Sequence, residues 1–182
     1  MARAIHLYIS SSPDLALERE ALGQAVAELP VTVGWEIKHT PRAGEIAPDV
    51  TASVAASDFV LVVLGADFAA PMGLEWQQAV SAGKVALAYV KQVLHSPSAQ
   101  TALREASFEF VPFEAPHELK ALAMRALARS LLDHSEHFGL HLSEVEPLLA
   151  LAGVEAKEGR PERDTRTGAE RGGVILGRGL LE

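Results

Sequence analysis

The chain has 182 residues, with 16 basic and 24 acidic side chains, 48% hydrophobic residues and no cysteine. This composition suits one globular domain with its own core, and every apolar run is far shorter than the ~20 residues of a membrane span. The missing cysteines exclude disulfides, iron–sulfur clusters and thiol catalysis, and the net charge of −8 argues against a nucleic-acid partner. We see no export signal and expect a cytoplasmic protein with no membrane partner.

Strand-like and helix-like patterns alternate along the chain. The first strand pattern leads into Ser12 and Pro13, which resemble the cap and first residue of a helix. The segment FVLVVL at 59–64 is apolar throughout, whereas 31–39 alternates apolar and polar residues. We predict strands over about 4–10, 31–39, 59–64, 85–90 and 108–113, and helices over about 12–28, 48–57, 72–82, 98–105 and 118–137.

This alternation predicts an α/β fold with a parallel sheet and helices on both faces. Continuously apolar strands belong in the middle of such a sheet, and alternating strands can form its edges, so we predict the strand order 2-1-3-4-5. We assign residues 1–138 to this domain and 139–182 to a C-terminal helix and a polar tail. The predicted order places the switch point between the first and third strands, where ligands of such sheets bind.

Polar residues gather at the carboxyl ends of the predicted strands around this switch point. Hydroxyl groups and free amides at a strand-to-helix turn suit a phosphate or a ribose, although plain helix capping would use the same residues. There is no glycine-rich cradle of the dinucleotide-binding or P-loop type. The predicted ligand-binding residues are Ser10, Ser11, Ser12, Asp14, Gly65 and Asp67, together with the loop at 40–48.

Two helices that start at this site carry charged residues. Glu75 lies in the first turn of the predicted helix 72–82, where a carboxylate can stabilise an oxocarbenium ion or simply stabilise the helix N-terminus. Glu18 and Arg19 flank the core-facing stripe of the first helix. Arg19 is predicted either to face the ligand and order the site or to belong to a structural ion pair.

Histidines offer two further possibilities. The spacing of His134, His137 and His141 can suit a metal ion, but histidines are also favoured near helix C-termini. We predict no metal site. His6 shares a strand face with Tyr8 and is expected to be a core histidine.

A family resemblance appears in several of these segments. Residues 9–22 read I-S-S-x-x-D-L-x-x-E-R-x-A-L, and residues 75–84 read E-x-x-x-A-x-x-x-G-K. Together with Ser57-Asp58 and Gly65-x-x-Phe68, these motifs resemble a bacterial domain family of unknown function within the TIR-like superfamily. That superfamily also includes nucleoside 2-deoxyribosyltransferases. The resemblance covers roughly residues 4–113.

The resemblance implies a flavodoxin-like, TIR-type fold and a nucleotide site. It implies that Glu75 attacks or stabilises the N-glycosidic carbon of NAD or a nucleoside, while the serine turn and Asp14 hold ribose or phosphate. On this interpretation no cofactor is required, and NAD or a related nucleotide is the substrate. The alternative is a non-catalytic signalling or assembly module that forms homo-oligomers through the tail.

Overall fold

The computed structural model describes residues 4–32, 34–40, 49–84 and 86–153. It contains one five-stranded sheet, all parallel, in the order β2-β1-β3-β4-β5. The strands are β1 (Ile5–Ser11), β2 (Trp35–His39), β3 (Phe59–Leu64), β4 (Ala86–Lys91) and β5 (Val111–Phe113). The helices are α1 (Ala16–Ala27), α2 (Val50–Ala56), α3 (Ala70–Ser81), α4 (Pro97–Glu105), α5 (Pro116–Asp133), α6 (Ser135–Phe138) and α7 (Leu142–Ala152). The predicted flavodoxin-like topology is confirmed.

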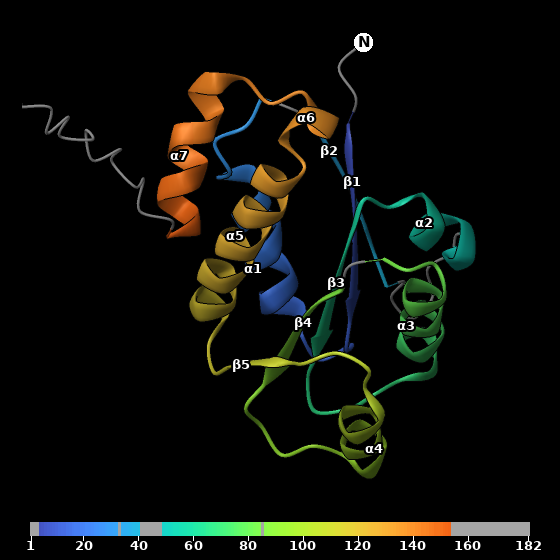
Figure 1. Cartoon of the computed structure of the whole chain (residues 1–182). Helices are drawn as coiled ribbons and strands as arrows, with labels where there is room; N and C mark the ends of the chain where they lie inside the picture. Colours follow the sequence, from blue (N-terminus) through green and yellow to red (C-terminus); the bar gives the residue numbers. More distant parts are fainter. Residues whose placement is uncertain (1–3, 33, 41–48, 85, 154–182) are drawn as a thin grey trace, which may run out of the picture.

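Helices cover both faces of the sheet and form two hydrophobic cores (Figure 1). Helices α1, α5 and α7 pack on one face, and α2, α3 and α4 pack on the other. The central strand β3 serves both cores, because its side chains alternate between the two faces. Phe59, Leu61 and Val63 face the first core, Val60 and Val62 face the second, and all are buried.

The sheet order places the carboxyl ends of β1 and β3 side by side. Ser10 lies opposite Val62, and Ser11 lies opposite Val63, at the end of the paired region. On its other side β1 pairs with β2, so that His39 lies beside Ile9. This is the switch point of the doubly wound sheet, and α1 and α3 begin beside it.

Several predicted limits differ from the structure. The helix predicted at 72–82 begins at Ala70, so that Glu75 is its sixth residue and does not lie in its first turn. The strand predicted at 31–39 begins at Trp35, and the helix predicted at 118–137 begins at Pro116 and is interrupted at His134. Helix α1 begins at Ala16 with Leu15 as its cap, not at Ser12, because the Ser12 hydroxyl bonds to the loop after β3 instead of to the helix. Strand β5 is shorter than predicted, because Phe108 and Phe110 pack against the Trp76 ring before the strand begins.

Helix α7 lies beyond residue 138 yet contributes to the first core. It packs against α5, and its Leu148 and Ala152 are fully buried. Its Glu144 carboxylate accepts hydrogen bonds from the Thr32 amide and hydroxyl and from the His141 amide at 2.5, 2.7 and 2.7 Å. Residues 154–182 of the predicted tail, through which homo-oligomers were expected to form, lie outside the described residues. The same holds for residues 41–48 of the predicted ligand-binding loop.

Replacing Glu144 with glutamine is expected to cost about 1–3 kcal/mol of unfolding free energy at pH 7, because an amide cannot accept all three bonds. The His141 amide, and then the Thr32 amide and hydroxyl, hold the pKa of Glu144 below its ordinary value of 4.5. The carboxylate therefore contributes its full stability above about pH 4.5 and loses it as the pH falls through the lowered pKa. Urea unfolding of both proteins should show a difference that shrinks below pH 4.5. A difference that is the same at pH 7 and in acid would contradict this role.

Candidate functional site

Glu75 is the centre of a buried hydroxyl network at the switch point. Its Oε1 accepts a hydrogen bond from the Tyr8 hydroxyl at 2.8 Å. Its Oε2 accepts from the Ser10 hydroxyl at 2.6 Å and from the Thr40 hydroxyl at 2.7 Å. Glu75, Tyr8 and Ser10 are 0% exposed and Thr40 is 7% exposed. The network therefore joins α3 to β1 and to the residue that follows β2.

The local sequence explains how these groups meet. Tyr8 and Ser10 share one face of β1 because side chains alternate along a strand. Glu75 lies on the buried stripe of α3 together with Met72 and Ala79, so its side chain points at that face. The predicted neighbours Glu75 and Ser10 are thus in contact.

Tyr8 also belongs to the network and was not predicted as a site residue, and Thr40 was predicted only as part of the loop at 40–48. Tyr8 was expected only as a core residue beside His6, and its place one strand period before Ser10 is the signal that could have identified it. His6 itself is not a core histidine, because its side chain is 41% exposed and its ring lies 3.6 Å from Glu36. The signal for Thr40 is weaker, because it depends on which strand pairs with β1.

Burial raises the pKa of Tyr8 well above its ordinary value of 10, and the Glu75 charge and hydrogen bond raise it further. Deprotonation would place a second negative charge beside the carboxylate in a site without water contact. The Tyr8 hydroxyl therefore stays protonated at neutral pH and remains a donor to Glu75. It fixes the orientation of the carboxylate.

The Ser11–Ser12 turn is held by Arg19. Nη1 of Arg19 donates to the Ser11 hydroxyl at 3.2 Å and to the Ser12 carbonyl at 3.1 Å. The Arg19 side chain is half-buried, and its Nε is buried without a hydrogen-bond partner among the described residues. The Ser11 amide in turn donates to the Thr40 hydroxyl at 3.0 Å. Arg19 is thus one step removed from Glu75 and acts on the backbone that carries the serines.

The other predicted residues tie the loop after β3 to the end of β1. The Ser12 hydroxyl donates to the Asp67 carbonyl at 2.7 Å and accepts from the Gly65 amide at 2.8 Å. The Asp14 carboxylate accepts from the Ala66 amide at 3.1 Å. Ser12 is fully buried, whereas Asp14 and Asp67 are exposed.

The Asp67 side chain is turned toward the start of α4. Its Oδ1 accepts hydrogen bonds from the Ser96 hydroxyl at 2.5 Å and the Ser98 hydroxyl at 2.8 Å. These two bonds, with one from the Phe68 amide, lower the pKa of Asp67. Ser96 also caps α4. Asp67 therefore anchors α4 in this structure, away from the Glu75 network.

Replacing Gly65 with alanine is expected to break the Asp14 bond to the Ala66 amide. An added Cβ would lie 2.5 Å from Oδ2 of Asp14, so this carboxylate must move away. We expect a loss of about 1 kcal/mol in urea unfolding, the value of one hydrogen bond. In an Asp14→Ala background the same replacement should be nearly neutral. A loss that is equal in both backgrounds would mean that the Cβ meets another obstacle.

Glu18 forms an ion pair at the same end of the sheet. Its Oε1 lies 2.7 Å from Nζ of Lys91, the last residue of β4. The Glu18 side chain is only 3% exposed, and that of Lys91 is 26% exposed. Of the two possibilities for the Glu18-Arg19 pair, a structural ion pair is realised for Glu18.

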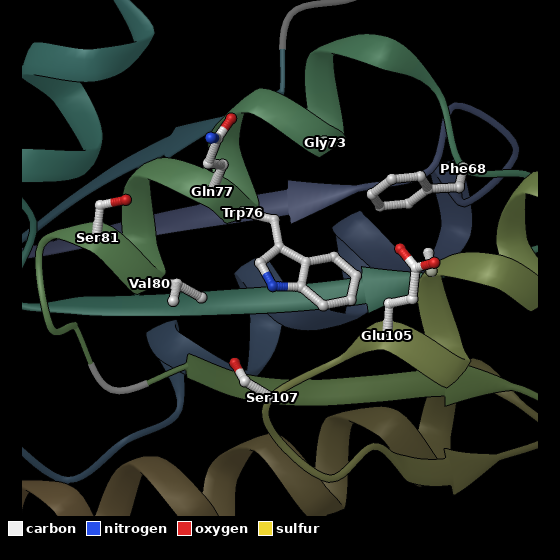
Figure 2. Close-up of a pocket in the computed structure, with 9 residues that line it drawn as sticks. Phe68, Gly73, Trp76, Gln77, Val80, Ser81, Glu105 and Ser107 are labelled. Atoms are coloured by element: carbon white, nitrogen blue, oxygen red, sulfur yellow. The ribbon is translucent and has the colours of Figure 1, made fainter.

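Two hollows lie beside α4. One of about 400 Å³ lies between α3 and α4, and one of about 420 Å³ lies between Phe68 and α4. Neither of them is lined by Glu75 or by the serine turn. Figure 2 shows the first of these hollows, with Trp76 and Phe68 in its wall. The Glu75 network and these two hollows are thus separate features of the molecule.

The histidines do not share one helix face. His134 ends α5, His137 lies in α6, and Gly139 has a φ of 63° before His141 begins the next helix. Within the described ranges, no group of three or more histidine, aspartate or glutamate side chains could hold a metal ion.

None of the described helices has the length and the apolar character that a membrane span requires.

Fold and site together define a flavodoxin-like α/β domain with a buried carboxylate at its switch point. No family model matches the chain, and no curated protein does. Among solved structures, it is similar to the sugar isomerase domain of an RpiR transcription factor from Sphaerobacter thermophilus. The TM-score is 0.40 at 17% identity, covering 83% of this chain and 78% of that one. A similarity this low does not indicate the family or the activity of this chain.

Proposed function

We propose that this chain is a TIR-like nucleotide-binding domain that cleaves the N-glycosidic bond of NAD or a nucleoside. Glu75 is the carboxylate that attacks the anomeric carbon or stabilises the oxocarbenium ion. The Ser10–Ser12 turn and Asp14 hold the ribose or phosphate. No cofactor takes part in this reaction.

The observation that supports this proposal is the hydrogen bonding of the Glu75 carboxylate at the switch point. Oε2 accepts hydrogen bonds from two hydroxyl groups, but among the described residues Oε1 accepts a hydrogen bond only from the Tyr8 hydroxyl. A carboxylate has about four accepting positions, so Oε1 keeps one for a ribose hydroxyl or an anomeric carbon. Tyr8 holds this oxygen, and Ser10 and Thr40 hold Oε2, so that the carboxylate is fixed by hydroxyl groups and not by a charged partner. This arrangement suits the stabilisation of a developing positive charge.

A second candidate is a non-catalytic signalling or assembly module. The full burial of Glu75 favours it, because a carboxylate that joins α3, β1 and Thr40 has a structural role without any ligand. The two candidates differ in whether a nucleotide is bound and cleaved. Burial of Glu75 further requires that a productive ligand displaces part of its surroundings.

The test is a panel of NAD, ribonucleosides and deoxyribonucleosides incubated with the wild-type protein. Release of the free base is followed by proton NMR, and saturation transfer reports ligands that bind without cleavage. The proposal expects base release from at least one member of the panel. Binding without base release would indicate a nucleotide sensor. If no member of the panel is bound or cleaved, the assembly module is favoured.

A further inference from the structure

A groove between α3 and α4 is a second feature of interest, and Glu75 does not line it. It has a volume of about 400 Å³. We call it the α3–α4 groove. Its principal lining residues are Phe68, Trp76, Val80, Ala102, Glu105 and Ser107 (Figure 2).

Two aromatic rings form a fixed corner in this groove. The rings of Phe68 and Trp76 are perpendicular, with centroids 5.4 Å apart. The Trp76 ring is supported by Phe108 at 4.8 Å and by Phe110 at 5.6 Å. Trp76 is only partly buried and lines the groove. Because these contacts restrict the indole, little further side-chain entropy is lost when a ligand binds against it.

The groove carries negative charge beside this corner. Glu105 lines it, and Figure 2 shows its side chain extending toward the Phe68 ring next to Trp76. None of the described residues that line the groove is lysine, arginine or histidine. The chain as a whole has a net charge of −8, which favours cations at longer range.

We propose that the α3–α4 groove binds a small organic cation that carries a methylated ammonium group. The faces of Phe68 and Trp76 attract the cation through their negative quadrupoles and cover its apolar methyl groups. The Glu105 carboxylate compensates the charge. Methylated ammonium groups suit such a site because they lose little hydration on entering an aromatic corner. The proposal does not depend on Glu75 or on nucleotide cleavage.

The test compares two probes of equal shape, choline and its uncharged isostere 3,3-dimethylbutan-1-ol. The chain has two tryptophans, so a ¹⁵N-labelled sample gives two indole signals, which a Trp35→Phe variant assigns. Trp35 packs against the opposite core and serves as an internal reference. We expect choline to shift the Trp76 indole signal in a saturable manner while the Trp35 signal stays in place. The isostere should bind at least about fivefold more weakly.

Three variants test the contributions of the walls. Glu105→Gln and Phe68→Leu should each weaken choline binding about five- to tenfold. The control Glu109→Gln removes the same charge from an exposed position outside the groove, and it should change choline binding less than about twofold. Any of three results would overturn the proposal. The two probes bind equally well, the two glutamate variants have equal effects, or choline does not move the Trp76 signal of the folded protein. An arginine-containing peptide that moves the Trp76 signal where choline does not would assign the groove to a protein partner instead.

Discussion

Replacing Glu75 with glutamine is expected to slow base release from the nucleotide substrate about a thousandfold or more. Glutamine has the shape of glutamate and still accepts hydrogen bonds through its carbonyl oxygen, but it lacks the negative charge. Loss of that charge beside an oxocarbenium ion raises the barrier by about 4 kcal/mol, which corresponds to this factor. Single-turnover measurements with saturating nucleotide report the chemical step directly.

The matched control is Glu20→Gln, which removes a carboxylate from an exposed position of α1. Its rate should equal that of the wild type. Because Glu75 also joins α3 to β1, thermal unfolding must show that the Glu75→Gln protein is folded at the assay temperature. A folded Glu75→Gln protein that cleaves the nucleotide at the wild-type rate would exclude Glu75 from the chemistry.

Replacing Lys91 with methionine is expected to cost about 3 kcal/mol of unfolding free energy, the largest stability effect that we predict. The replacement leaves the Glu18 carboxylate buried with 3% exposure and without its cation. Removing one partner of a buried ion pair costs far more than removing both, because the remaining charge is shielded from water and has no counterion. Replacing Glu18 with leucine in the Lys91→Met protein should therefore recover most of the loss.

The control for this prediction is Lys120→Met. Lys120 lies 2.6 Å from Glu28, but the Glu28 side chain is 55% exposed and can be hydrated when its partner is removed. We expect a cost below about 1 kcal/mol. Urea unfolding of the four proteins gives both comparisons, and equal costs for Lys91→Met and Lys120→Met would mean that Glu18 regains water in the folded state.

The fold could be predicted from sequence because its strongest signals are local. The run FVLVVL coincides with β3 at both ends, since only a strand buried on both faces is apolar at every position. The order of the strands followed from the same contrast between apolar and alternating strands. Predicted limits were less accurate where a long-range contact competes with a local preference. Ser12 is such a case, because its hydroxyl bonds to Gly65 and Asp67 rather than capping α1.

The site could be predicted only in part. Glu75 and Ser10 were both expected at the switch point, because Ser10 lies near the end of β1 and Glu75 was predicted in the first turn of a helix that begins there. The contact with Ser10 is present although Glu75 is the sixth residue of α3. The loop at 40–48 was predicted as part of the site, but the contacts of Thr40 with Glu75 and of Lys91 with Glu18 were not, because no local sequence pattern marks them. A residue that follows an edge strand contacts α3 only when the strand order and the twist of the sheet bring them together. Asp67 shows the converse, because a predicted ligand residue bonds to Ser96 and Ser98 of α4 instead.

The most direct test of the proposed nucleotide site is a crystal structure of the Glu75→Gln protein with the nucleotide that the wild type cleaves. The variant keeps the shape of the site and slows turnover enough for the intact substrate to accumulate. Our account predicts the ribose within hydrogen-bonding distance of residue 75, with the rest of the nucleotide against the Ser10–Ser12 turn. A nucleotide bound elsewhere, for example in the α3–α4 groove, with residue 75 still enclosed by Tyr8, Ser10 and Thr40, would contradict it.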